Sequence, residues 1–224
     1  MPRGSLVRPH AAHWCPVTAP PSYPRVILLA GPSGSGKSSL AARSGLPVLN
    51  LDDFYKEATD PSLPALPDGG GADWDSPLSW DADAAVAAIG TLCRTGRTEV
   101  PLYDIPTSSR TGSASLALHG APLCVAEGIF AAEIIDRCRE LGLLADALCL
   151  TGRPLTTFRR RLVRDLREGR KPVPYLLRRG LRLLRAERGI IARQTGLGAH
   201  PCDADSALRR IAAAATAPAA HLAA

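Results

Sequence analysis

The sequence predicts an α/β fold in which a parallel β-sheet is covered by helices on both faces. Short segments of strand length alternate along the chain with helical patterns, and these strand segments are apolar throughout. Strands that are apolar on both sides are typical of a sheet buried on both faces. A length of 224 residues allows one domain with a full core and an appended lid or tail.

The elements follow one another in a regular order. Turn-forming residues flank four segments of buried-strand type, which are residues 25–30, 47–51, 123–126 and 147–150. Helical patterns cover residues 81–93 and 129–141. The Pro and Gly content of residues 61–73 predicts a loop. Weak alternation and two prolines in residues 98–118 predict a small β-excursion beside the active site.

Composition predicts flexible ends and no membrane segment. Residues 1–24 are rich in Pro, Ala and His and lack the apolar core of a signal peptide, so we expect a flexible N-terminal tail. Residues 213–224 are of low complexity and predict a flexible C-terminal tail, which leaves residues 25–212 as the folded domain. No apolar run approaches the ~18 residues of a membrane span.

The cysteines predict a reduced, cytoplasmic protein. All six are scattered without C-x-x-C pairs, and Cys124 and Cys149 lie in predicted buried strands, where a thiol acts as a small hydrophobe. We therefore expect neither a disulfide framework nor a cysteine metal site. The net charge of +6 is local, because arginines concentrate between residues 153 and 193. Such a cluster suits either a nucleotide or a nucleic acid, and composition does not decide between them.

Residues 31–38 fill every position of the phosphate-binding pattern G-x-x-x-x-G-K-[ST], between a predicted strand and a predicted helix. The glycines allow successive N–H groups to point at a phosphate, while Lys37 can reach the terminal phosphates and the Ser38 hydroxyl can ligate Mg²⁺. The pattern predicts a P-loop NTPase that binds a nucleoside triphosphate. The expected nucleotide ligands are Gly31, Ser33, Gly34, Ser35, Gly36, Lys37, Ser38 and Ser39.

Acidic residues follow two of the predicted strands, at the sheet edge where such folds bind ligands. Asp52 and Asp53 follow residues 47–51, and Glu127 follows residues 123–126. One carboxylate could accept the proton of an alcohol while another holds Mg²⁺, and we assign these roles to Asp52 and Glu127. The alternatives are a helix N-cap for either aspartate and a solvated strand end for Glu127. Gly128 is expected to let the backbone turn away after Glu127.

Residues 157–167 carry arginines on one helical face and apolar side chains on the other. A row of guanidinium groups could close over a triphosphate and stabilise charge during transfer. We therefore predict an Arg-rich helical lid at about residues 153–171, with a solvated helix face as the alternative.

Together these motifs resemble the uridine kinase family of P-loop kinases over about residues 25–170. The resemblance rests on the P-loop, on Leu-Asp-Asp-Phe-Tyr at 51–55, on Trp-Asp-Ser-Pro-Leu-Ser-Trp-Asp at 74–81, on Pro-Leu-Tyr-Asp at 101–104 with Arg110, on Glu127-Gly128, and on the arginines of the lid. The chain departs from the family pattern at Ser108, where the family usually has a histidine that reads the pyrimidine, and at Thr157, where the lid usually has its leading arginine. Beyond Pro172 there is little resemblance.

The resemblance implies an ATP- or GTP-dependent kinase that uses Mg²⁺ held at Ser38 and Glu127. It places Asp52 as the base for a nucleoside 5′-hydroxyl, Asp75 at the ribose hydroxyls, and Tyr103 and Arg110 near the base. The implied catalytic residues are Asp52, Lys37 and Arg164, with Arg160 added to the nucleotide ligands. The implied substrate-binding residues are Asp52, Tyr55, Asp75, Tyr103, Arg110, Arg161 and Arg170.

The predicted activity is phosphorylation of uridine or cytidine to UMP or CMP, a reaction of pyrimidine salvage, with a small-molecule nucleoside as the partner. One alternative keeps the chemistry but changes the acceptor to a sugar phosphate or pantothenate. A basic nucleic-acid-binding protein is less favoured, because the arginines are not interleaved with aromatic residues. A purely regulatory nucleotide binder would not need both Asp52 and the lid. The sequence is compatible with a homo-oligomer.

Overall fold

The computed structural model describes residues 23–67, 69–152 and 187–216, and its centre is a five-stranded sheet. The strand order is β2-β5-β1-β6-β7, and every neighbouring pair in it is parallel. The strands are β1 (Arg25–Ala30), β2 (Val48–Asn50), β5 (Leu123–Glu127), β6 (Leu144–Leu150) and β7 (His200–Cys202). The four predicted strands are therefore confirmed, and β7 is added at the edge.

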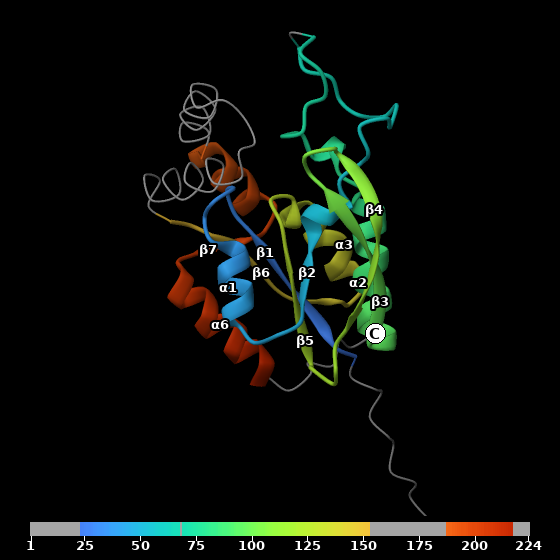
Figure 1. Ribbon diagram of the computed structural model, residues 1–224. Coiled ribbons are helices and arrows are strands. Elements are labelled where there is room, and N and C mark those ends of the chain that lie inside the picture. Colours follow the sequence, from blue (N-terminus) through green and yellow to red (C-terminus); the bar gives the residue numbers. More distant parts are fainter. Residues whose placement is uncertain (1–22, 68, 153–186, 217–224) are drawn as a thin grey trace, which may run out of the picture.

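The two faces of the sheet carry separate hydrophobic cores, which explains why β1 is apolar throughout. Val26 and Leu28 of β1 belong to one core, and Ile27 and Leu29 belong to the other. The first core is shared with α2 (Ala82–Thr95) and α3 (Ile135–Glu140). The second is shared with α1 (Lys37–Arg43) and α6 (Ala204–Thr216), so helices cover both faces, as Figure 1 shows.

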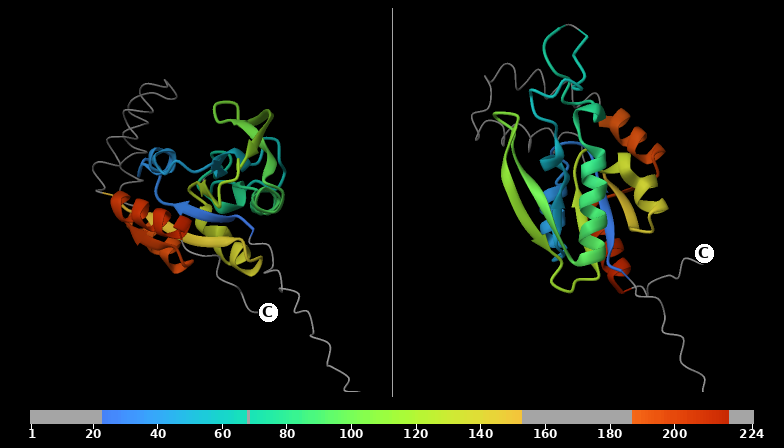
Figure 2. Two further views of the ribbon diagram at one scale, coloured as in Figure 1. Left: turned by 90° about the horizontal axis from the view of Figure 1, so that it is seen from below. Right: turned by 90° about the vertical axis from the view of Figure 1, so that its right-hand side faces the viewer.

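The predicted β-excursion is a hairpin that forms a sheet of its own. β3 (Arg97–Asp104) pairs with β4 (Ser109–Ala117) in antiparallel fashion, and Tyr103 lies directly opposite Arg110. Ser108 in the connecting turn has a φ of 51°, in the left-handed region. Figure 2 shows the hairpin running beside α2, at the side of the main sheet.

In the described part of the chain, three short 3₁₀ helices lie between these elements: η1 (Leu51–Phe54), η2 (Pro77–Ser79) and η3 (Ala131–Ile134). The helix expected over residues 129–141 thus begins as η3 and becomes α-helical at Ile135. The loop predicted at residues 61–73 is confirmed, since the residues described there form turns and one isolated bridge between Ala65 and Ala72.

The C-terminal boundary lies later than the expected residue 212. α6 runs through to Thr216, and Ala214 and Ala215 pack against the core that contains Ile211. Partial burial of these two alanines stabilises the helix in this low-complexity segment. The rest of that segment, the N-terminal tail up to residue 22 and the lid arginines Arg160, Arg161, Arg164 and Arg170 all lie outside the described residues.

The cysteines of the described segments are free and buried, including Cys124 in β5 and Cys149 in β6, as the sequence predicts. In the same segments, every helix is too short or too polar to cross a membrane.

Candidate active site

The loop after β1 has the geometry of a phosphate cradle. Gly31, Gly34 and Gly36 have φ values of 146°, 80° and 99°, which side chains with a Cβ rarely adopt. A Cβ on Gly31 would also lie 2.8 Å from the carbonyl oxygen of Leu150. The loop can therefore keep this path only with glycine at position 31, next to the carboxyl end of β6.

The fit of this loop to a phosphate group can be tested on one hydroxyl. Ser35 is 7% exposed, and its Oγ is buried with no hydrogen-bond partner among the described residues. A buried donor without a partner is costly, and a phosphate oxygen in the cradle would satisfy it. The residues present therefore fit the phosphates of a nucleotide.

Lys37 opens α1 and folds back over this loop. Its side chain is buried, and Nζ donates hydrogen bonds to the carbonyl oxygens of Gly31, at 3.0 Å, and Pro32, at 3.3 Å. The ammonium charge is thereby held within the cradle rather than in solvent. Ser38 and Ser39, the next residues of the helix, are exposed at its N-terminal end.

Glu127 ends β5 beside this loop and is only 5% exposed. It lies opposite Leu29 of β1 and Asn50 of β2, so the sheet register places it between the P-loop strand and the strand that leads to Asp52. Burial raises the pKa of Glu127, hydrogen bonding with Ser38 and the charge of Lys37 oppose that rise, and the charge of Asp52 adds to it. Lys37, Ser38 and Asp52 are therefore close enough to Glu127 to affect its charge, and the four residues form one electrostatic site.

Neither aspartate of η1 serves as its N-cap, so that alternative from the sequence is excluded. The cap is Asn50, whose side chain accepts a hydrogen bond from the Asp52 N–H at 3.2 Å. Asn is a common N-cap, so its place two residues before Asp52, at the end of the predicted strand, was a sequence signal that could have identified this role. The side chains of Asp52 and Asp53 remain available for other contacts.

Asp52 and Asp53 have different surroundings. Asp52 Oδ1 accepts a hydrogen bond of 3.4 Å from the backbone N–H of Ile129, just after β5. Burial raises the pKa of Asp53, and hydrogen bonds from Asn50 and from the backbone of Tyr103 oppose the rise. Asp52 is therefore anchored on the P-loop side, whereas Asp53 contacts the hairpin.

Gly128 has a different role from the expected one. Its φ is not positive, so the turn after β5 does not require glycine for its dihedral angles. A Cβ on Gly128 would instead lie 2.8 Å from Leu51 Cβ and 3.1 Å from Asp52 Oδ1. Glycine is needed here because the end of β5 and η1 approach each other closely.

Aromatic residues line the other side of η1. The ring of Tyr55 packs against Trp74, Tyr103 and Phe130, with centroid distances of 6.1, 6.0 and 5.8 Å. The Tyr55 hydroxyl donates to the carbonyl oxygen of Trp74 at 3.3 Å. This contact holds the segment that carries Asp75 beside η1, and Asp75 itself is exposed.

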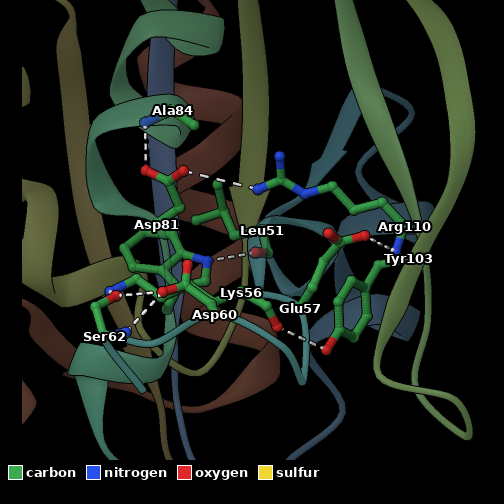
Figure 3. A network of polar contacts seen from close by, with 10 residues as sticks. Leu51, Lys56, Glu57, Asp60, Ser62, Asp81, Ala84, Tyr103 and Arg110 are labelled. Carbon is green, nitrogen blue, oxygen red and sulfur yellow. Dashed lines mark hydrogen bonds and ion pairs between the residues drawn. The ribbon is translucent and has the colours of Figure 1, made fainter. Parts of the chain in front are cut away.

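Tyr103 and Arg110 connect the hairpin to this side of the site, as Figure 3 shows. The Tyr103 hydroxyl donates to the carbonyl oxygen of Lys56 at 3.0 Å, and burial raises its pKa. The Arg110 N–H donates to Glu57 Oε1 at 3.0 Å, and its guanidinium lies 3.7 Å from Asp81. The sequence motifs contained Asp81 but did not indicate its pairing with Arg110.

The structure thus brings the predicted residues together in two groups. Lys37, Ser38, Asp52 and Glu127 meet at the carboxyl ends of β1, β2 and β5, where parallel sheets bind ligands. Tyr55, Tyr103 and Arg110 lie on the hairpin side of η1. Asp75 is joined to the second group through Trp74.

Comparison with known proteins finds relatives among uridine kinases. No family model matches the chain. The chain is 30% identical over 173 residues to a uridine kinase of Chloroflexus aurantiacus, covering 73% of this chain and 78% of that protein. It is 32% identical over 154 residues to a uridine kinase of Saccharomyces cerevisiae, covering 66% of this chain and 30% of that protein. The chain spans about a third of the length of the yeast relatives that it matches.

Among solved structures, a fructose transport system kinase of a Silicibacter species superimposes with a TM-score of 0.54 at 18% identity. The match covers 80% of this chain and 88% of that chain, and at this identity it shows the shared fold alone. The sequence match to the Chloroflexus protein extends over most of both chains. The chain belongs to the uridine kinase family.

Proposed function

We propose that the chain transfers the terminal phosphoryl group of ATP, or of GTP, to the 5′-hydroxyl of a pyrimidine ribonucleoside. The observation that carries the proposal is the convergence of Lys37, Ser38, Asp52 and Glu127 at one edge of the sheet. A P-loop that only bound a nucleotide would not need a carboxylate held at the position of Asp52.

In the proposed reaction the backbone of the P-loop and Lys37 bind the phosphates of the nucleotide. Ser38 and Glu127 would hold Mg²⁺, which supplies charge neutralisation at the phosphates when it is bound. Asp52 accepts the proton of the acceptor hydroxyl, because a positioned carboxylate can serve as a general base. Arg160 and Arg164 are proposed to act on the phosphate charge, and Arg161 and Arg170 on the acceptor.

Three residues of the described segments are proposed to contact the ribose diol and the base of the nucleoside. Asp75 would hold the ribose hydroxyls, for which an exposed carboxylate is accessible, and Tyr103 and Arg110 would lie near the base. Both hairpin residues are already engaged with the loop that follows η1, so a bound base would contact a preformed surface. A pre-formed surface reduces the entropy cost of binding.

The acceptor is tested by measuring kcat/KM for uridine, cytidine, deoxyuridine and adenosine with ATP and Mg²⁺. Loss of one ribose hydroxyl should lower kcat/KM if Asp75 binds the diol, and strongly if the bound nucleoside shields the otherwise exposed Asp75 carboxylate from water, which then leaves it without that partner. Discrimination between bases should be weaker, because Ser108 stands where a histidine usually reads the pyrimidine. Equal rates on uridine and deoxyuridine would remove Asp75 from this role.

A second candidate keeps the kinase chemistry but uses another small alcohol, such as a sugar phosphate or pantothenate. It is favoured by Ser108, whose short side chain on a left-handed turn cannot read a base as an imidazole does. Turnover of a sugar phosphate or pantothenate, with none of any nucleoside, would establish this alternative. Measuring kcat/KM for these acceptors beside the nucleosides distinguishes the two candidate functions.

A further inference from the structure

A buried glutamine lies behind the proposed base. Gln194 belongs to the helical segment of residues 187–196, which is orange in Figures 1 and 2, and it is only 4% exposed. Its Nε2 donates a hydrogen bond of 2.8 Å to the carbonyl oxygen of Ile129, and its Oε1 accepts one of 3.2 Å from the Cys149 thiol. Both ends of the amide are therefore satisfied inside the protein.

The position of this amide is informative because burial of an amide is costly. An apolar side chain of similar length could fill the same space without needing partners. A polar group with a hydrogen-bond partner at each end in a low-dielectric interior instead fixes the groups around it. The group fixed most directly by Gln194 is Ile129.

Ile129 lies in the turn between β5 and η3, where neither a strand nor a helix holds it. Its two backbone groups have separate anchors: the N–H donates to Asp52 Oδ1 at 3.4 Å, and the carbonyl oxygen accepts from Gln194. A displacement of Ile129 would move the donor that contacts the Asp52 carboxylate. At 3.4 Å that contact is already long, so a small shift would break it.

We infer that Gln194 is a positioning residue, which holds Ile129 so that the backbone N–H of Ile129 orients the Asp52 carboxylate. The inference rests on the proposed function in one respect, namely that Asp52 acts as the base. The helix is also attached by an ion pair of 3.0 Å between Arg193 and Glu133, which is partly exposed and, among the described residues, makes no hydrogen bond to Ile129. This neighbouring contact provides a matched control.

The test compares Gln194→Met, which keeps the volume but removes both hydrogen bonds, with Arg193→Ala. Misplacement of a general base lowers kcat rather than binding, so Gln194→Met should lower kcat about 10-fold with both KM values within about 2-fold. Arg193→Ala should stay within about 2-fold of the wild type, since exposed ion pairs contribute little. In an Asp52→Asn background Gln194→Met should cause no further loss, because the two changes remove one function.

Gln194→Glu supplies a signature that general destabilisation would not produce. Burial raises the pKa of a carboxyl at this position, and the protonated form can donate to the Ile129 carbonyl and accept from Cys149. The activity of Gln194→Glu relative to the wild type should therefore rise as the pH falls, whereas the ratio for Gln194→Met stays flat. A flat ratio for both variants would overturn the inference.

Amide hydrogen exchange gives a readout that does not depend on the reaction. The Ile129 amide should exchange faster in Gln194→Met than in Arg193→Ala, at equal global stability. If the wild type turns over no acceptor, the proposed function fails, and the exchange rates still decide whether Gln194 holds Ile129. If the wild type is active but Gln194→Met loses activity additively with Asp52→Asn, or exchanges as the control does, the inference fails alone.

Discussion

The indole N–H of Trp80 donates a hydrogen bond of 2.7 Å to the backbone carbonyl oxygen of Leu51, the residue directly before Asp52. Leu51 begins η1, and Trp80 follows η2, so the bond fastens the segment that carries Asp75 to the helix that carries the proposed base. Both residues are buried. This buried hydrogen bond thus joins the two halves of the proposed acceptor site, in addition to the bond from Tyr55 to the Trp74 carbonyl oxygen.

Trp80→Phe should therefore destabilise the protein and weaken acceptor binding. Phenylalanine keeps most of the apolar contact but leaves the Leu51 carbonyl oxygen buried without this donor, which costs about 1–3 kcal/mol. Urea denaturation measures the change in the free energy of unfolding, and steady-state kinetics measure the acceptor KM. Trp74→Phe is the control, because the indole N–H of Trp74 is not what anchors Leu51. Equal effects of the two substitutions would contradict this role of Trp80.

Lys37→Ala should reduce turnover by about 10²-fold or more, because a preorganised cation at the phosphates is lost. Lys37 is buried against its own loop, so a small decrease in thermal stability should accompany the loss. Arg43→Ala, an exposed change at the other end of α1, should leave kcat unaltered. Near-normal kcat in a folded Lys37→Ala variant would show that the site lies elsewhere.

Asp52→Asn should lower kcat by about 10²–10⁴-fold while substrate binding is retained, as expected for the loss of a general base. Asp53→Asn should have a smaller effect, because Asp53 contacts Asn50 and the backbone of Tyr103 on the hairpin side. The paired kinetic measurement distinguishes the two. A tenfold larger loss for Asp53→Asn would mean that the neighbouring carboxylate is the base.

Gly128→Ala should lower kcat more than it raises the KM for ATP. The added Cβ would meet Leu51 Cβ at 2.8 Å and Asp52 Oδ1 at 3.1 Å, so η1 must move away from β5 and take Asp52 with it. We expect a loss of stability of about 1–3 kcal/mol, typical of overpacking. Gly189→Ala is the control, because a Cβ there would meet nothing within 4 Å and the φ of Gly189 is not positive. A fully active Gly128→Ala enzyme would show that the approach is not needed.

Glu127 should make the protein, without Mg²⁺ and nucleotide, less stable as the pH rises. Burial raises the pKa of Glu127 above 4.5, so the folded state keeps this proton to higher pH than the unfolded state does. Its stabilising proton is fully present below pH 4.5 and is lost as the pH rises through the folded pKa. Glu127→Gln should therefore unfold at a higher temperature than the wild type near neutral pH, and the difference should shrink on acidification.

Thermal unfolding between about pH 4 and pH 8 measures this difference, with Glu140→Gln as an exposed control. The same Glu127→Gln variant should lose activity, since a neutral amide binds Mg²⁺ less well than a carboxylate. A variant that is less stable than the wild type at neutral pH would contradict the expected cost of the buried charge.

Much of the fold follows from local sequence patterns. The apolar run of residues 25–30 predicts a strand buried on both faces. In the structure its side chains are divided between the two cores, which explains why the run is apolar at successive positions. The hairpin was also predictable, although its separate sheet was not. β7 was not predicted, because three residues that include a proline are too few to show the alternating pattern of a strand.

The sequence by itself determined the P-loop, the order of the strands along the chain, and the residue types available at their carboxyl ends. These features are local, since a glycine pattern or an apolar run constrains the backbone within a few residues. Only the tertiary structure decided which aspartate contacts the end of β5, why Gly128 must be glycine, and what lies behind Ile129. Those answers depend on contacts between residues 77 and 65 positions apart, whose pairing is set by how the strands and helices pack together.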